Sequence, residues 1–172
     1  MPNFLEQLVA EWYEFQSYFV LRNVNVGKRP NGGYASELDV VAFHPEKRRL
    51  VHVETSMDCY SWEKRQKRFA AKFRAGKKHI PDLIRGFPDL PEIEQMVILV
   101  YGGDINHSKI GGGRLILIKD FMNQIYRGLE TRKVRNAAVP EQYVILRGLQ
   151  FAANYWNFQK TKEMDEFTEE ID

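Results

Sequence analysis

Two short apolar runs, joined by a polar connector, constrain the fold of this chain more than any other feature of its sequence. The runs cover residues 37–43 and 50–56, and the connector at 44–49 places Pro45 among charged side chains. Both runs are rich in β-branched and aromatic residues, which favour strands. Two such runs around a short turn-forming connector predict a β-hairpin.

The register of this hairpin follows from its connector. An even loop centred between Glu46 and Lys47 places Asp39 on one strand directly opposite Glu54 on the other. Opposed residues on one sheet face lie roughly 4.5 to 5.5 Å apart at Cβ, so two like charges there repel each other. We therefore expect a cationic group between the two carboxylates. The same register gives the pairs Glu37–Ser56, Val41–His52 and Phe43–Leu50.

The two faces of the hairpin are expected to differ in burial. The face opposite the carboxylates is mostly apolar and suits the core of a domain. It would consist of Leu38, Val40, Ala42, Val51, Val53 and Thr55. Asp39 and Glu54 would then lie on the less buried face.

Two converging carboxylates favour a metal site at this end of the hairpin. Hard divalent cations such as Mg²⁺ and Mn²⁺ prefer oxygen ligands and keep several waters that a phosphate substrate can displace. Asp39 and Glu54 would bind the metal, with a backbone carbonyl near Thr55 as a further ligand. A solvated polar end of a hairpin, with no metal, is the alternative interpretation.

These elements resemble the PD-(D/E)XK nuclease superfamily, which has the restriction-endonuclease-like fold. In that family an acidic residue on one strand precedes a Glu-x-Lys on the next, and the matching residues here are Asp39 and Glu54-Thr55-Ser56. The resemblance covers roughly the first 100 residues. It implies an α/β domain with a mixed central β-sheet flanked by helices, and a metal-dependent hydrolysis of phosphodiester bonds.

The family pattern also includes a helix on each side of the hairpin in the sequence. The upstream helix carries an acidic residue, which Glu14 matches, within an apolar pattern that predicts a helix from Phe4 to about Leu21. The downstream helix often carries a Gln or a displaced Lys, which Gln66 or Lys67 would supply. Glu14 and Gln66 would organise the site; an exposed helix residue and a Gln at the rim of the core are the alternatives.

Ser56 occupies the position where the family usually has its lysine. That lysine orients the attacking water and neutralises charge that develops on the phosphate. The next predicted helix, which Ser61 would cap, offers Lys64, Lys67 and Lys72 as replacements, of which Lys64 and Lys67 are the candidates for catalysis. A degenerate domain that has lost its chemistry and serves as an interaction module is the competing hypothesis.

Positive charge is concentrated in the segment that follows the hairpin. Net charge is only +2, but residues 161–172 hold six acids against Lys162, which leaves +7 on the rest of the chain. A basic stretch is typical of a nucleic-acid backbone contact, although a solvated helix face is the ordinary explanation of such a run. The candidate contacts are Lys64, Arg65, Lys67, Arg68, Lys72 and Arg74.

The second half of the chain is expected to complete the domain. An apolar run at 96–101 reads as a buried strand, 102–113 as a glycine-rich loop, and 114–118 as a further strand. Two helices would follow, one from Asp120 to about Leu129 and one from Pro140 to about Phe158, whose packing face would include Leu146, Leu149, Ala153 and Trp156. The prediction is one nuclease-like domain over 1–160, with an acidic, flexible tail at 161–172.

Composition limits the class of protein. Cys59 is the single cysteine, so no intramolecular disulfide can form, and Glu6 and Glu11 interrupt the first apolar stretch where a signal peptide would lie. No run approaches the roughly 20 apolar residues of a membrane span. We expect a cytoplasmic nuclease that acts on DNA or RNA without a membrane partner, and the sequence leaves open whether it forms a homodimer.

Overall fold

Residues 34–56 form the predicted hairpin. Strand β2 (Tyr34–His44) pairs antiparallel with strand β3 (Arg49–Ser56). The observed pairs Phe43 with Leu50 and Val41 with His52 confirm the predicted register. The connector between the strands turns through Arg48, whose φ of 46° is in the left-handed region.

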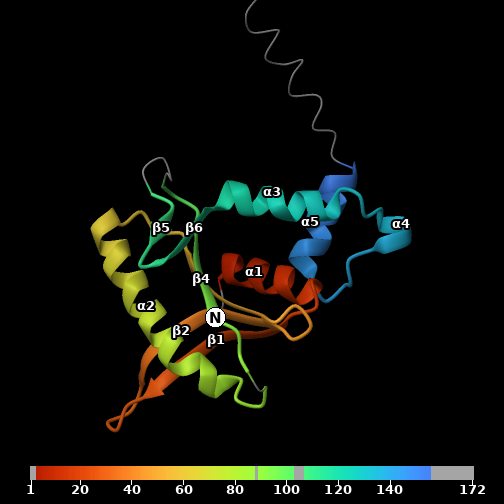
Figure 1. Cartoon of the computed structure of the whole chain (residues 1–172). Coiled ribbons are helices and arrows are strands. Elements are labelled where there is room, and N and C mark those ends of the chain that lie inside the picture. The colour runs from red at the N-terminus through yellow and green to blue at the C-terminus, as the bar shows by residue number, and fades with distance from the viewer. Residues whose placement is uncertain (1–2, 88, 103–106, 156–172) are drawn as a thin grey trace, which may run out of the picture. The chain divides into compact units, whose positions relative to one another are not determined.

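The hairpin is part of a six-stranded mixed sheet in the order β1-β2-β3-β4-β6-β5 (Figure 1). Strand β3 runs parallel to β4, and β4 parallel to β6, whereas the other neighbours are antiparallel. The remaining strands are β1 (Phe19–Lys28), β4 (Ile93–Leu99), β5 (Lys109–Ile110) and β6 (Gly113–Leu117). The expected mixed sheet flanked by helices is therefore present.

The computed structural model describes residues 3–87, 89–102 and 107–155. The chain divides into two compact units, Met1–Ile125 and Tyr126–Asp172. The first unit contains the whole sheet. Among the described residues, no helix combines the length and the apolar character that a membrane span needs.

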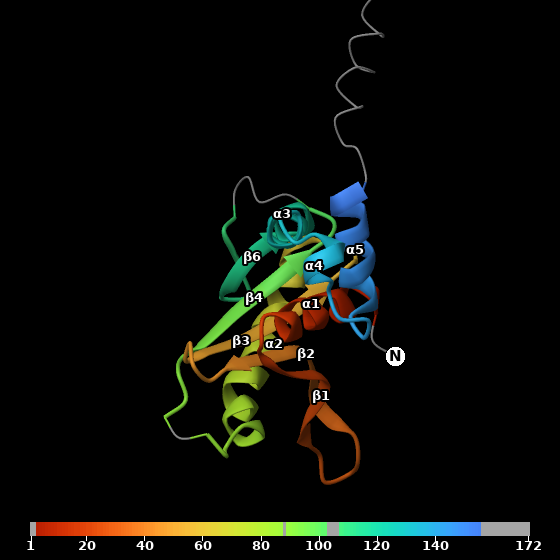
Figure 2. The ribbon, with the colours of Figure 1, turned by 90° about the vertical axis from the view of Figure 1, so that its right-hand side faces the viewer.

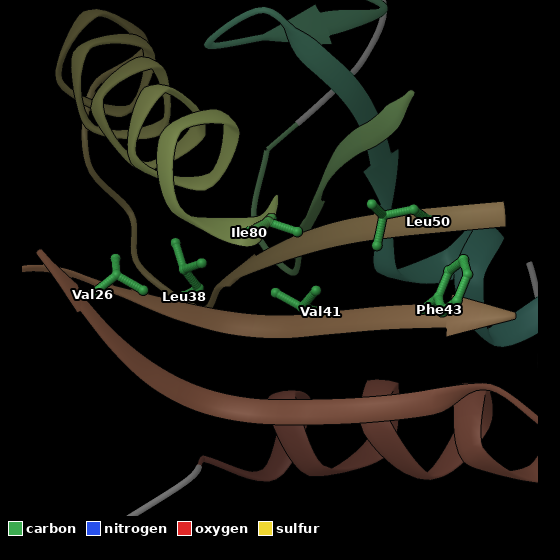
Figure 3. Packing of buried hydrophobic residues seen from close by; sticks show 6 residues of the cluster. All are labelled: Val26, Leu38, Val41, Phe43, Leu50 and Ile80. Carbon is green, nitrogen blue, oxygen red and sulfur yellow. The ribbon is translucent and has the colours of Figure 1, made fainter. Parts of the chain in front are cut away.

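Helices α1 (Phe4–Phe15) and α2 (Trp62–Leu83) cover opposite faces of the sheet (Figures 2 and 3). Two neighbouring residues of β4 contact these two helices on opposite faces of the sheet. The Gln95 side chain donates to the Phe73 carbonyl of α2, and Met96 accepts a hydrogen bond from the Tyr13 hydroxyl of α1. Both faces of the central strands are consequently buried.

Helix α1 is shorter than the apolar pattern predicted. It ends at Phe15, because Ser17 adopts a left-handed φ of 68° and the N–H groups of Ser17 and Tyr18 bond back to the carbonyls of Glu14 and Tyr13. This is the hydrogen-bond pattern of a Schellman motif. The aromatic and β-branched residues that follow join β1 instead, where they pair with β2.

Side-chain alternation is interrupted near Asp39. Leu38 and Val41 are three residues apart, which would place them on opposite faces of a regular strand, yet both belong to the cluster under α2 (Figure 3). Asn23, with a left-handed φ of 50°, lies on β1 between the residues paired with Leu38 and Val40. The prediction that Leu38 shares a face with Val40 is therefore wrong.

The carboxylates do not lie on a less buried face, contrary to the prediction. Asp39 is 7% exposed, Glu54 1% and His52 fully buried. The cause is α2, which packs over this side of the hairpin. The pairing of the two strands does not by itself indicate where this helix lies. Acidic groups on this face must find partners inside the protein.

Helix α2 begins as expected, and its last turn contains a proline. The Ser61 hydroxyl accepts a hydrogen bond from the Lys64 N–H at 3.4 Å, as an N-cap should. Pro81 lies within the helix, which continues to Leu83. Ile80, which is fully buried against the hairpin, holds this last turn in place.

The second unit is built around a buried glutamine. Helix α3 (Ile118–Leu129) crosses the boundary between the units, and α4 (Val134–Ala137), which was not predicted, and α5 (Val144–Tyr155) follow. Gln150 of α5 donates to the Arg132 and Ala137 carbonyls and accepts from the Val139 N–H. Helix α5 starts at Val144, later than the predicted start at Pro140. Trp156, Phe158 and the tail at 161–172 lie outside the described residues.

Candidate functional site

A lysine lies between the two opposed carboxylates. The Lys72 ammonium of α2 is 2.8 Å from Asp39 Oδ1 on β2 and 2.7 Å from Glu54 Oε2 on β3. Its third hydrogen bond goes to the Glu37 carbonyl at 2.5 Å. Three residues from three elements therefore form one site, here called the carboxylate–lysine cluster (Asp39, Glu54 and Lys72), and the expected cation between the carboxylates is present.

Asp39 is fixed by the neighbouring strand. Its Oδ2 accepts from the Thr55 N–H at 2.8 Å and from the Thr55 hydroxyl at 3.1 Å. The Asp39 N–H in turn points to Glu54 Oε1 at 3.4 Å. Backbone and side-chain groups thus cross-link the ends of the two strands where the regular ladder has stopped at the pair Val40 and Val53.

Glu54 is oriented by a buried chain of hydrogen bonds. The Gln95 amide nitrogen lies 2.9 Å from the Phe73 carbonyl and 3.2 Å from His52 Nδ1. A nitrogen that donates to the carbonyl must be the amide NH₂, so His52 Nδ1 accepts from it. His52 Nε2 then carries the hydrogen and donates it to Glu54 Oε1 at 2.8 Å. This assignment of the tautomer follows from the network.

Charge in the cluster is shaped by burial. Burial raises the pKa of the Glu54 carboxyl, and the adjacent Asp39 raises it further, against the lowering effect of His52 and Lys72. Burial alone would lower the pKa of Lys72, but the carboxylates of Glu54 and Asp39 outweigh it and raise this pKa above its ordinary value. Lys72 therefore keeps its positive charge at neutral pH.

The cluster opens to solvent through a pocket of about 450 Å³. Its volume is in the range of small-ligand sites. It is lined by Asn3, Glu6, Asp39, Glu54, Thr55, Ser56, Met57, Asp58, Arg68, Phe69 and Lys72. The wall carries four acidic residues and two basic ones, so a phosphate-bearing ligand would meet positive charge beside Arg68 and Lys72.

Ser56 has a structural partner of its own. Its hydroxyl donates to Asp58 Oδ2 at 2.6 Å and accepts from the Asp58 N–H at 3.2 Å. Asp58 also pairs with Arg65 at 3.0 Å and Arg68 at 2.5 Å. Burial would raise the pKa of Asp58, but the hydrogen bonds from these groups and from the Tyr60 N–H hold it well below its usual range. The loop after β3 is therefore tied around an ionised carboxylate.

The two lysines favoured from the sequence for catalysis lie elsewhere. Lys67 is on the exposed side of α2 and pairs with Glu63 at 2.7 Å. The Lys64 ammonium lies 3.3 Å from the centre of the Tyr60 ring. Lys72, which the sequence offered as a third replacement, is the one beside Asp39 and Glu54.

The two predicted organising residues also have other partners. Glu14 forms a salt bridge with Arg22 at 2.6 Å, and the residue of α1 that lines the pocket is Glu6. Gln66 is exposed on α2 and accepts from the Gly111 N–H at 2.9 Å. Helix α2 rotates Gln66 away from the sheet because Phe69 and Phe73 take the buried positions.

The predicted nucleic-acid contacts divide into two groups. Lys64, Lys67 and Arg74 are exposed along α2, and Arg68 is partly exposed. Arg65 is 5% exposed and bonds to Asp58 and the Tyr101 carbonyl, so it serves the loop structure instead.

Helical spacing contained a signal for Lys72. It follows the buried Phe69 by three residues and precedes the buried Gly76 by four, which places it on the sheet side of α2. Lys64 and Lys67 are not spaced by three or four residues from both Phe69 and Gly76, so this pattern does not place them on the sheet side. Glu6 and Asp58 were missed as pocket residues. Glu6 lies in the first turn of α1, and the residue of that helix that matched the family pattern was Glu14.

Two carboxylate oxygens, Asp39 Oδ1 and Glu54 Oε2, converge on the Lys72 ammonium. Within residues 3–87, 89–102 and 107–155, no group of three or more His, Cys, Asp or Glu side chains is arranged to hold a metal. Asp39 Oδ1 and Glu54 Oε2 are therefore the pair of carboxylate oxygens that could serve as metal ligands here. The sequence matches no protein-family model and no curated protein.

Proposed function

We propose that this chain is a metal-dependent nuclease of the PD-(D/E)XK type that hydrolyses phosphodiester bonds in DNA or RNA. The observation that carries the proposal is the position of the Lys72 ammonium, within 2.8 Å of Asp39 and 2.7 Å of Glu54 at the wall of an open pocket. Two carboxylates and one lysine from a hairpin and the following helix are the groups that this chemistry needs.

Asp39 and Glu54 would hold Mg²⁺ or Mn²⁺ through the oxygens that now face Lys72, with the Thr55 carbonyl as a further ligand. When bound, such a metal lowers the pKa of a coordinated water and offsets the charge on a scissile phosphate. Glu54 is prepared for this task because His52 fixes one of its oxygens at 2.8 Å and leaves the other directed at Lys72. In the same way, the Thr55 N–H fixes Asp39 Oδ2 and leaves Asp39 Oδ1 directed at Lys72.

Lys72 would take the role of the lysine that Ser56 replaces. Its ammonium would donate to the attacking water or to a phosphate oxygen, where a positive group stabilises the charge that develops in the transition state. The exposed bases of α2 would bind the nucleic-acid backbone without reading its sequence.

A second candidate is a nuclease-like module that binds nucleic acid or protein without cleaving. It is favoured by the complete pairing of the cluster: both oxygens of Asp39 and of Glu54 already have donors within the chain. Such a network is what a purely structural ion pair would show. We propose a cytoplasmic location for the chain with either function.

Cleavage of labelled single-stranded DNA, duplex DNA and RNA in Mg²⁺ or Mn²⁺ tests the proposal. Lys72→Met and Asp39→Asn should each lower the rate at least about 100-fold, the usual contribution of such groups. Lys119→Met is the control, since it removes an exposed lysine of α3 that belongs neither to the carboxylate–lysine cluster nor to the bases of α2, and it should keep the rate within about twofold.

Two further observations separate loss of function from loss of structure. Circular dichroism should show each variant folded, and Mg²⁺ should raise the melting temperature of the wild type but not of Asp39→Asn. Cleavage that is absent with every metal and substrate, or unchanged in both site variants, would exclude the nuclease and leave the module.

A further inference from the structure

The loop between β3 and α2 presents an exposed aromatic ring beside the pocket. Tyr60 is 48% exposed, although its backbone N–H is fixed to Asp58 Oδ1 at 3.1 Å. Arg68, which lines the pocket, has its guanidinium 5.8 Å from the centre of the Tyr60 ring. The ring therefore lies next to the opening through which a substrate would reach the carboxylate–lysine cluster.

Two cations accompany this ring. The Lys64 ammonium lies 3.3 Å from the ring centre, and the Arg68 guanidinium lies further out. These cation–π contacts hold the ring against the first turns of α2 and leave almost half of the residue open to solvent. An aromatic face next to positive charge is the combination by which proteins bind single-stranded nucleic acid.

Asp58 makes this arrangement rigid. One carboxylate accepts hydrogen bonds from the Ser56 hydroxyl, the Tyr60 N–H and the Arg65 and Arg68 guanidinium groups. The loop is thereby ordered before any ligand binds, which removes part of the entropic cost of binding. Ser56, at the position of the missing lysine, contributes to this loop.

A second aromatic side chain nearby is less suited to a ligand. Trp62 is half-buried and its ring stacks on His107, with centroids 4.0 Å apart. That stack covers one face of the indole, as Lys64 covers one face of the Tyr60 ring, but Trp62 is the more buried of the two residues. Tyr60 is the residue of this loop that offers a ring together with a nearby phosphate-binding cation.

We propose that Tyr60, Lys64 and Arg68 form a nucleotide subsite that selects single-stranded nucleic acid. A base would stack on the open part of the Tyr60 ring, and its phosphate would pair with Lys64. Bases in a duplex are stacked and paired, so they reach such a ring only after unstacking. The inference rests on the nucleic-acid substrate of the proposed function and adds the strand state of that substrate.

Fluorescence anisotropy with labelled oligothymidylate and a labelled duplex of the same length tests the subsite. The full chain is measured in EDTA, so that binding is observed without cleavage. Tyr60→Ala should weaken binding of the single strand roughly tenfold, within the range known for base–aromatic stacking, and leave duplex binding unchanged. Tyr60→Phe should bind like the wild type because the ring remains.

Tyr34 is the matched control, because it is also 48% exposed but lies at the start of β2. Tyr34→Ala should keep single-strand affinity within about twofold, whereas Lys64→Ala should lower the salt dependence of binding by about one counterion. Equal effects of Tyr60→Ala and Tyr34→Ala, or duplex binding as tight as single-strand binding, would overturn the proposal. Because no metal is present, Tyr60-dependent binding would persist even if the nuclease proposal failed.

Discussion

Glu54 shows how a single acidic residue is stabilised inside this protein. It is 1% exposed, and its two oxygens interact with His52, Lys72 and the Asp39 N–H. His52 lies on the same strand as Glu54, whereas Asp39 and Lys72 come from β2 and α2. A buried carboxylate without them would be protonated or would destabilise the fold. Its orientation therefore depends on the residues that hold His52 in place.

Gly76 provides the space for His52, so Gly76→Ala should be destabilising. A Cβ at this position would lie 2.3 Å from His52 Nδ1. Replacing a helical Gly by Ala usually stabilises by about 1 kcal/mol, but the clash should reverse the sign and cost about 1 to 3 kcal/mol. Urea unfolding measures the difference.

Gly148→Ala in α5 is the control for this prediction, because a Cβ there meets nothing within 4 Å. It should raise the free energy of unfolding by up to about 1 kcal/mol. If Gly76→Ala were as stable as Gly148→Ala, His52 would have room to move and its role in orienting Glu54 would be wrong.

At the level of elements, the two helices on the sheet have different tasks. Helix α2 supplies Lys72 to the site, whereas α1 closes the opposite face with side chains such as Tyr13. The Tyr13 hydroxyl lies 3.5 Å from the sulfur of Met96 on β4. Burial raises the pKa of Tyr13 from 10.0 to about 12, more than the nearby Arg49 lowers it.

This shift predicts an alkaline weakening of the contact between α1 and the sheet. The folded state holds the phenol proton to higher pH than the unfolded state, so its contribution is complete below the ordinary pKa and is lost as pH rises. Between pH 10 and 12, the wild type should lose about 1.4 kcal/mol per pH unit relative to Tyr13→Phe. Unfolding of both proteins across this range gives the slope, and parallel curves would contradict the prediction.

At the level of the whole molecule, charge is unevenly distributed along the sequence. The chain carries +2 overall, but residues 161–172 contribute six acids and Lys162, so the rest carries +7. Exposed bases on α2 belong to this positive part. Under the proposed function, a polyanion would bind the positive part of the chain, and the acidic segment would lower the net charge that the polyanion meets at low ionic strength.

Removal of residues 161–172 should consequently strengthen nucleic-acid binding. We expect affinity to rise about three- to tenfold at low salt and the difference to vanish at high salt, where charges are screened. Anisotropy titrations of the full and shortened chains over a salt series measure this. An unchanged affinity at low salt would show that the acidic segment does not influence the binding surface.

Local sequence determined the hairpin of this protein. The register was predictable because β-branched runs and a short connector specify strand pairing between near neighbours, as Val41 and His52 confirm. The cation between Asp39 and Glu54 was predictable because two like charges at that distance need one. The N-cap at Ser61 was equally local.

Tertiary structure decided which residues complete the site. Lys72, and neither Lys64 nor Lys67, reaches the carboxylates because packing of Phe69 and Phe73 fixes the rotation of α2 on the sheet. The same packing buries a hairpin face that the sequence suggested was more open. The spacing along α2 indicates the side of the helix on which Lys72 lies, but the strands that it meets there are set by contacts between distant segments.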